Sequence, residues 1–243
     1  PLMEDNLEDA VTNNIIGTWN LVQMSIQHKV ECFVLISTDK AVQPVNIMGM
    51  TKHVAERIVR LAAAQTGRPY VSVRFGNVLG SRGSIIPLFQ RQIASGGPVT
   101  ITHPEMERYF MTIPEAVQLV LQASTLGKNG EVFVLDMGDP VNITDLACDM
   151  IELSGYQVGE DIQIEYTGLR PGERLSEALF SQDEKYTRTQ HEKIFVACNG
   201  LAPSIEDFTQ KIQAIERLAK TGRTTELRQK LEELTTPKNK PLS

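Results

Sequence analysis

The sequence predicts an α/β fold built on a doubly wound parallel sheet. Two short apolar segments, 30–36 and 69–75, are rich in β-branched and aromatic residues, as expected of strands that are buried on both faces of a parallel sheet. Each is followed by a polar cluster and then by a longer segment with helical periodicity. Alternation of strand and helix is typical of α/β folds, which bind ligands at the carboxyl ends of their strands.

Local signals predict the elements before residue 98. Pro44 and Asn46 interrupt the chain, and the residues after them lack glycine beyond the first turn, which favours a helix. Pro87 is tolerated because it falls in the first turn of the next helix. Helices are predicted over 7–27, 48–64 and 85–95, and the last of them ends at Gly96-Gly97-Pro98.

The elements predicted after residue 97 are shorter. Thr112 and Thr144 are suited to cap two helices, 114–124 and 144–154. Beyond Ser204, apolar stripes predict two amphipathic helices that form packing or oligomer surfaces, and the last seven residues are expected to fray. Strands are predicted over 99–102, 131–136 and 162–166.

The composition argues against several classes of function. A net charge of −6 and a pI near 5.3 argue against a nucleic-acid partner, which requires a basic surface. The cysteines Cys32, Cys148 and Cys198 lack metal-ligand spacing, so we expect no metal site and interpret them as buried thiols of a reducing compartment. The sequence has no signal peptide and no apolar run of about 18 residues, so no segment of it is expected to span a membrane.

The first polar cluster, Ser37-Thr38-Asp39-Lys40, places hydroxyls, an acid and a base just past a strand. Such residues also serve ordinary turns. An acid and a lysine that are adjacent in an extended segment point to opposite sides, so both reach one ligand only if the chain turns here. On the following helix Met48 and Lys52 lie four residues apart and share a face, although each alone is typical of packing or of a solvated surface.

The second polar cluster is the loop 76–84, which contains three glycines, Asn77 and Arg82. Glycines let a backbone approach a ligand closely, and arginine is suited to phosphate. Such a loop is equally typical of a flexible connection, so it is weak evidence by itself.

Four segments together resemble the nucleotide-sugar 4,6-dehydratases of bacterial polysaccharide biosynthesis, which are extended short-chain dehydrogenase/reductases. The resemblance covers residues 1 to about 200 in family order, and its segments are 36–42 (ISTDKAV), 48–52 (MGMTK), 74–84 (RFGNVLGSRGS) and 168–173 (GLRPGE). It implies a Rossmann-like doubly wound sheet with a smaller carboxyl-terminal substrate-binding region.

A domain organisation follows from the resemblance. Residues 1–97 are expected to be the remaining part of an NAD-binding domain with the catalytic residues, 98–203 the nucleotide-sugar-binding region, and 204–243 carboxyl-terminal helices. No G-x-G-x-x-G motif, which would hold the cofactor pyrophosphate, occurs in the sequence. We therefore expect the amino-terminal half of the sheet to be missing and the chain to be an inactive carboxyl-terminal portion of a longer enzyme.

The resemblance also implies roles for individual residues. The catalytic set comprises Asn14, whose backbone orders water near the lysine in the family, with Thr38, Asp39, Lys40, Met48 and Lys52. NAD is expected to contact Ser37, Lys52, Asn77 and Val78. A UDP-sugar substrate is expected to contact Asn77, Pro98, Val99, Thr100, Ile101, Arg108, Arg170 and Glu173, although Arg108 and Arg170 are equally suited to surface ion pairs with Glu105, Glu107 or Glu173.

These roles predict a UDP-N-acetylglucosamine 4,6-dehydratase of surface polysaccharide or glycan biosynthesis. Most of the superfamily has tyrosine where this chain has Met48, and a thioether carries no proton to transfer. Methionine here is familiar in the large, membrane-anchored dehydratases of the family. The alternatives are a non-catalytic nucleotide-sugar-binding relative and a sugar-nucleotide 4-epimerase. We expect a cytoplasmic homo-oligomer that meets the inner membrane only through segments missing from this sequence.

Overall fold

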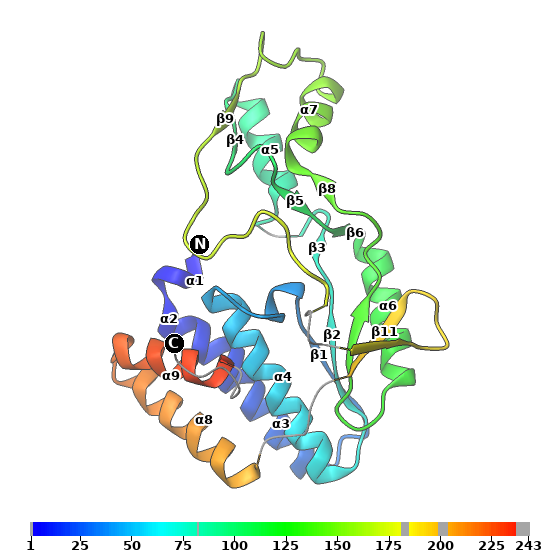
Figure 1. The fold of residues 1–243 in the computed structure, drawn as a ribbon, viewed down its shortest axis with the longest axis vertical. Helices are drawn as coiled ribbons and strands as arrows, with labels where there is room; N and C mark the ends of the chain where they lie inside the picture. The colour runs from blue at the N-terminus through cyan, green and yellow to red at the C-terminus, as the bar shows by residue number, and fades with distance from the viewer. Residues whose placement is uncertain (1, 82, 181–184, 199–203, 237–243) are drawn as a thin grey trace.

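A computed structural model describes residues 2–81, 83–180, 185–198 and 204–236. Its main sheet has the strand order β1-β2-β7-β11-β10 among these residues (Figure 1). β1, β2 and β7 run parallel, whereas β11 and β10 each pair antiparallel to their neighbour. The bounds are β1 (Phe33–Ile36), β2 (Tyr70–Arg74), β7 (Val132–Leu135), β10 (Lys185–Arg188) and β11 (Ile194–Cys198). The predicted α/β class is confirmed, and the antiparallel strands are an addition to it.

The remaining strands form small pairs outside the main sheet. β3 (Asn77–Val78) pairs with β6 (Phe110–Met111), β4 (Val99–Ile101) with β9 (Ile164–Tyr166), and β5 (Glu107–Arg108) with β8 (Val141–Asn142). The helices are α1 (Leu2–Asp5), α2 (Leu7–Val11), η1 (Thr12–Ile16), α3 (Gly17–Gln27), η2 (Asp39–Ala41), α4 (Ile47–Thr66), α5 (Ile85–Ala94), α6 (Ile113–Leu126), α7 (Ile143–Leu153), α8 (Ile205–Lys220) and α9 (Thr224–Thr235).

Helices cover both faces of the parallel strands, as a doubly wound sheet requires (Figure 1). On one face, α2, α3 and α4 share a core with α8 and α9, into which Phe208 and Leu231 insert. On the other face, α6 packs against Val71, Val73 and Phe133. The predicted amphipathic helices after Ser204 therefore pack within the chain.

The main sheet contains strands from both sides of the domain boundary expected at residue 97. β7, β10 and β11 lie beyond it in sequence, yet they extend the sheet that β1 and β2 begin. A separate apolar cluster joins α5, β4 and α7 in the upper part of Figure 1. The carboxyl-terminal helices likewise share one core with the amino-terminal helices.

Some local predictions hold and others need correction. The predicted helix 7–27 is confirmed in its bounds, and it contains within it the π-helical turn η1, which carries Asn14. β1 is not fully buried: Leu35 is its single buried residue, and Ile36 is 44% exposed. It is also an edge strand, since it pairs only with β2 among the described residues. The cap of α7 is Asn142, whose side chain accepts hydrogen bonds from the amides of Thr144 and Asp145.

The cysteine interpretation also needs correction. Cys32 is exposed just before β1, and Cys148 on α7 is half-buried. Burial raises the pKa of both thiols. The Cys198 side chain, Arg82 and the predicted frayed segment 237–243 lie outside what the structure describes. None of the described helices is both long and apolar enough to cross a membrane.

The shared core predicts that α9 stabilises the rest of the chain. Leu231→Ala removes a fully buried side chain and should lower the free energy of unfolding by about 2–5 kcal/mol. Leu153→Ala removes the same side chain at a position that is 88% exposed and should change it by less than about 0.5 kcal/mol. Urea denaturation followed by circular dichroism measures both, and equal effects would contradict this account of the core.

Candidate functional site

The candidate site lies where three parallel strands end together. Ile36 pairs with Val73, and Val73 pairs with Phe133, so the segments that follow β1, β2 and β7 leave the sheet at one edge. The amide of Ser37 donates to the Val73 carbonyl at 2.8 Å. The amide of Asp39 donates to the Phe75 carbonyl at 3.2 Å, which keeps the two polar clusters side by side.

The turn that the sequence requires after Thr38 is present as η2. The Thr38 hydroxyl accepts a hydrogen bond from the Lys40 amide at 3.3 Å and donates one to Asp39 Oδ1 at 2.8 Å. Lys40 Nζ lies 2.9 Å from the same carboxylate oxygen. Asp39 and Lys40 therefore form a close ion pair although they are adjacent in sequence.

The second oxygen of the Asp39 carboxylate is buried without a hydrogen bond in the described part of the chain. Asp39 is only 1% exposed, and a buried polar atom without a partner is costly, by about 1–3 kcal/mol. A Cβ added at Gly76 would lie 3.2 Å from this Oδ2. A side chain at this position would therefore crowd the Asp39 carboxylate, whose second oxygen retains the capacity to accept a proton or a hydrogen bond.

Lys40 faces two further polar groups. Asn77 Oδ1 lies 3.5 Å from Lys40 Nζ, so Asn77 contacts the catalytic candidates directly. Glu177, which the sequence analysis missed, is only 7% exposed and interacts electrostatically with Lys40 and Asp39. Burial, assisted by the Asp39 charge, raises the pKa of Glu177 against the opposing effect of nearby cations. In the sequence, Glu177 is marked only by its place between the apolar residues of the segment RLSEALF, which follows GLRPGE.

A buried ion pair between Glu56 and Arg74 anchors Ser37, the first residue of the first polar cluster. Ser37 Oγ donates to Glu56 Oε1 at 2.6 Å, and Arg74 donates to both Glu56 oxygens at 2.8 and 2.7 Å. Burial alone would raise the pKa of Glu56, but the Arg74 charge and these hydrogen bonds outweigh it and lower that pKa. The Ser37 hydroxyl therefore points toward Glu56 in the core, and the expected contact of Ser37 with a cofactor stays a prediction.

Helix α4 brings Met48 and Lys52 to the end of β1. Lys52 Nζ donates to the Ile36 carbonyl at 3.2 Å, and burial lowers the pKa of Lys52 while the Glu56 charge opposes that shift. Met48 is half-buried. The structure explains why this segment has glycine at position 49, because a Cβ there would overlap the carbonyl oxygen of Lys40.

Asn14 reaches the same helix from the π-helical turn. Its Nδ2 donates to Thr51 Oγ1 at 3.0 Å, and that hydroxyl donates to the Met48 carbonyl at 2.9 Å. The Asn14 carbonyl accepts a hydrogen bond from Thr18 at 2.7 Å. Its expected part in ordering water stays a prediction, but its link to the helix of Met48 and Lys52 is direct. π-helical turns are frequent at functional sites.

The expected substrate residues divide into two groups. Val99 and Ile101 are buried in the apolar cluster around β4, so their side chains are unavailable to a ligand, and Thr100 is hydrogen-bonded to Gln92. Pro98 is exposed at the start of this strand. These four residues lie at β4, which packs with α5 and α7 in the upper part of Figure 1. We call this part of the molecule the small lobe.

Arg108 and Glu173 are engaged within the chain. Arg108 donates to the carbonyls of Leu175 and Arg174 at 2.9 Å each, and lies 3.9 Å from Glu173 Oε1. Glu173 also accepts hydrogen bonds from Thr102 and from the amide of Arg170. Arg170, which is also an expected phosphate ligand, has a side chain that is exposed to solvent.

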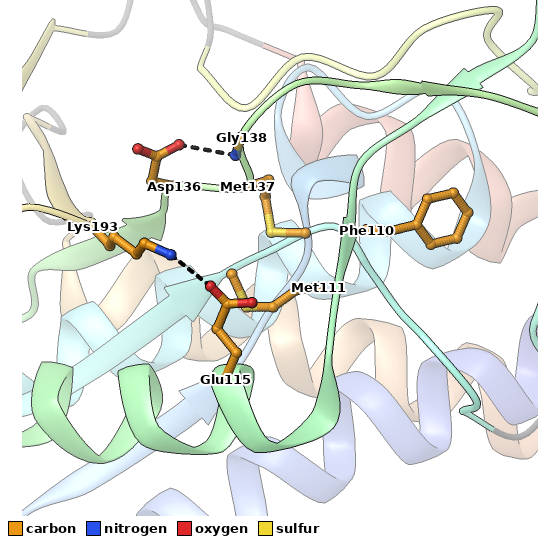
Figure 2. Close-up of a pocket in the computed structure, with 7 residues that line it drawn as sticks. All are labelled: Phe110, Met111, Glu115, Asp136, Met137, Gly138 and Lys193. Atoms are coloured by element: carbon orange, nitrogen blue, oxygen red, sulfur yellow. Dashed lines mark hydrogen bonds and ion pairs between the residues drawn. The ribbon is translucent and has the colours of Figure 1, made fainter.

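A small pocket adjoins the site (Figure 2). Its walls come from β6, the start of α6, the residues after β7 and Lys193, and Lys193 pairs with Glu115 at 2.8 Å. Met137 connects it to the site, because the Met137 sulfur accepts a hydrogen bond from the Gly76 amide at 3.4 Å. Its volume of about 160 Å³ is below the roughly 300–1,000 Å³ of pockets that enclose a whole small ligand.

The residues present fit one half of a dinucleotide cofactor. Lys52 at the end of β1 and Asn77 with Val78 beyond β2 lie at the strand ends, where nicotinamide and its ribose would bind. Asp39 Oδ2, which is buried and has no hydrogen-bond partner among the described residues, lies at the same edge. Residues for the pyrophosphate are not found in this sequence, which has no G-x-G-x-x-G motif.

A family model described as "Polysaccharide biosynthesis protein" matches residues 1–199. The chain belongs to this polysaccharide biosynthesis protein family. Capsular polysaccharide biosynthesis protein CapD of Staphylococcus aureus is 57% identical over 196 residues, 80% of this chain and 33% of CapD. Probable polysaccharide biosynthesis protein EpsC of Bacillus subtilis is 52% identical over 220 residues, 88% of this chain and 37% of EpsC. The chain spans about a third of the length of these two relatives.

Other relatives in the comparison carry different names. UDP-glucose 4-epimerase of Rickettsia prowazekii is 37% identical over 180 residues, 72% of this chain and 51% of that protein. The structure of Pen from Bacillus thuringiensis has a TM-score of 0.74 at 38% identity and covers 84% of this chain and 62% of Pen. DesIV, the dTDP-glucose 4,6-dehydratase of Streptomyces venezuelae solved with NAD bound, has a TM-score of 0.61 at 19% identity, over 70% of this chain and 56% of DesIV. These similarities confirm the Rossmann-like fold of short-chain dehydrogenase/reductases.

The close approach at Gly49 gives a first prediction for the site of this family member. Gly49→Ala should lower the free energy of unfolding by about 2–3 kcal/mol, because the helix and the Lys40 backbone must separate. Gly17→Ala, also within a helical segment, meets only an ordinary contact at 3.6 Å and should be neutral or stabilising by up to about 1 kcal/mol. Chemical denaturation of both variants tests this, and a tolerated Gly49→Ala would contradict the described contact.

The buried ion pair gives a second prediction. Glu56→Gln should destabilise the protein at pH 7 by about 3–5 kcal/mol, because Arg74 loses the opposite charge beside it. The folded-state pKa of Glu56 lies below its ordinary value of 4.5, so its contribution is complete above that value and disappears as pH falls through the folded-state pKa. Unfolding measured from pH 7 to pH 3 should therefore show wild type and variant converging in acid, whereas a constant difference would refute the assignment.

Proposed function

We propose that the full-length protein is a UDP-N-acetylglucosamine 4,6-dehydratase that acts in surface polysaccharide or glycan biosynthesis. The observation that carries the proposal is the η2 turn, which joins Asp39 and Lys40 at 2.9 Å while one buried Asp39 oxygen has no hydrogen-bond partner within the part of the chain that the structure describes. An acid and a base at one point are what dehydration requires. Membership of the polysaccharide biosynthesis family supports this reading.

The chemistry explains why two proton-transfer groups are needed. The C5 hydrogen of a hexose is not acidic until C4 is a ketone, because only then does negative charge at C5 spread onto an oxygen. NAD, when bound, accepts hydride from C4 and returns it to C6. The chain must therefore provide a base for the 4-hydroxyl, a base for C5 and an acid for the departing 6-hydroxyl.

We assign the elimination to Asp39 and Lys40. Before elimination the proton of the ion pair passes from Lys40 to Asp39 across their 2.9 Å contact, which leaves a neutral amine and a carboxylic acid. The Lys40 amine then takes the C5 proton, and the electrons of the C5–H bond form the C5–C6 double bond. The C6–O bond breaks with its electrons on oxygen, and Asp39 supplies the proton that completes water. Thr38, hydrogen-bonded to Asp39 at 2.8 Å, is suited to orient the 4-hydroxyl, and the cationic Lys52 to favour its alkoxide.

Because Met48 occupies the position of the usual tyrosine, α4 supplies no side chain there that can take the 4-hydroxyl proton. A thioether neither donates nor accepts the 4-hydroxyl proton, so we assign that proton to Thr38, Asp39 or ordered water. In this proposal Asn77, Pro98, Thr100, Arg170 and Glu173 contact the UDP-sugar, and Val78 the nicotinamide side. Homo-oligomer formation and membrane attachment through segments outside this chain belong to the same proposal.

A 4-epimerase is the second candidate, because a relative with 37% identity is named UDP-glucose 4-epimerase. Epimerisation also begins with oxidation at C4, but it needs no acid and base for C5 and C6. The close Asp39–Lys40 pair therefore favours dehydration. A non-catalytic sugar-nucleotide-binding protein is the third candidate, since Met48 replaces the usual proton-transfer tyrosine.

Mass spectrometry of the full-length protein with UDP-N-acetylglucosamine separates the three candidates. Loss of one water identifies a dehydratase, a C4 epimer of unchanged mass an epimerase, and binding without product a binding protein. Lys40→Ala and Asp39→Asn should each reduce turnover by about 10²–10⁴-fold and preserve substrate binding. Exposed Lys128→Ala and Asp149→Asn serve as matched controls that should keep full activity.

A further inference from the structure

Helix α4 contacts the η2 turn at two consecutive backbone carbonyls. Gly49 lies against the carbonyl of Lys40, where no Cβ fits. One helical turn further along α4, Nδ1 of His53 lies 3.1 Å from the carbonyl oxygen of Ala41. Residues that are four apart share a face of a helix. One face of α4 therefore holds the backbone on the carboxyl side of Lys40 at both positions.

The Ala41 carbonyl cannot obtain a hydrogen bond by continuing the turn. The amides of Ala41 and Val42 each donate to the carbonyl three residues earlier, at 3.1 and 3.0 Å. In this pattern the donor for the Ala41 carbonyl would be the amide of residue 44, which is proline and has no N–H. Ala41 is fully buried, where an acceptor without a donor is costly. His53 therefore supplies the hydrogen bond that Pro44 cannot.

The same contact identifies the nitrogen of His53 that carries hydrogen. A carbonyl oxygen only accepts, so Nδ1 is the donor. Burial has the largest influence on the pKa of His53 and lowers it, and the charges of Arg74 and Arg57 act in the same direction. Glu56 and the hydrogen bond to Ala41 oppose the shift. At pH 7 the ring is thus neutral, with its hydrogen on Nδ1.

We propose that His53 is a positioning residue whose Nδ1–H fixes the end of the η2 turn and, through it, the direction of the Asp39–Lys40 pair. The inference rests on the proposed function, in which this pair exchanges protons with C5 and the 6-hydroxyl. The Lys40 side chain is long, so its amine is placed accurately only if the backbone on both sides is held. Thr38 holds the amino-terminal side by accepting from the Lys40 amide at 3.3 Å, and Gly49 and His53 hold the other. His53 acts through the turn and transfers no proton.

The first test compares His53→Leu with His53→Asn in the full-length protein. Leucine is close to histidine in volume but has no donor, whereas the amide nitrogen of asparagine takes the place of Nδ1. His53→Leu should lower kcat about 10–10²-fold and change KM less than about twofold, and His53→Asn should keep kcat within about threefold of wild type. The exposed His28→Leu is the matched control and should keep full activity. A role in packing alone gives the opposite order, because leucine fills the space and asparagine does not; that order, or an unchanged kcat in His53→Leu, would overturn the proposal.

The second test does not depend on turnover. Hydrogen–deuterium exchange of a peptide that spans residues 37–43, followed by mass spectrometry, reports on the Ala41 and Val42 amides, which are bonded within the turn. His53→Leu should accelerate their exchange roughly three- to tenfold, with His53→Asn close to wild type. A peptide from α7 in the small lobe should exchange alike in all three proteins.

The two tests separate the two proposals. If neither wild type nor variant forms product, the dehydratase proposal fails, while the exchange of residues 37–43 still decides the role of His53. Unchanged exchange in His53→Leu, or equal acceleration in His53→Leu and His53→Asn, would show that the Nδ1 hydrogen bond does not hold the turn.

Discussion

The buried ion pair between Glu56 and Arg74 is the constraint on which the site depends. Glu56 lies on α4, Arg74 ends β2, and the Ser37 hydroxyl at the end of β1 completes the arrangement. A charge removed from water is tolerated only with opposite charge and hydrogen bonds in good geometry. The rotation of α4 that brings Glu56 to Arg74 and Ser37 also directs Lys52, one turn earlier, to the Ile36 carbonyl at the end of β1.

The close packing at Gly49 extends this constraint to the η2 turn. With α4 held by Glu56, its first turn lies against the Lys40 carbonyl, where no side chain fits. The η2 turn is then enclosed between α4 and the glycine of the next loop, Gly76, which adjoins Asp39 Oδ2. Among the described residues these contacts leave Asp39 Oδ2 buried without a hydrogen-bond partner, and such local violations of polar pairing are typical of functional sites.

The sequence contains enough information for the strand–turn–helix units and the tight turn at Asp39, because their signals are local. Apolar runs, helical periodicity and the opposed directions of adjacent side chains all act within a few residues. Features that arise from distant contacts were missed or misjudged. β10 is an exposed strand with the polar sequence KYTR and is recognisable only by its pairing with β11. The direction of Ser37 depends on Glu56, and the place of Glu177 depends on Arg108, a residue far away in sequence.

The segment 172–177 links the two parts of the molecule that a nucleotide-sugar enzyme must coordinate. Glu173 is tied to Thr102 beside β4, whereas Arg174 and Gly172 are tied to the loop after η2. This backbone therefore couples the position of β4 to that of the loop after η2. Under the proposed function, in which Glu173 contacts the UDP-sugar and Lys40 acts on it, one short segment links substrate position to the η2 turn, and the segment 168–173 that carries the resemblance is also a structural connection.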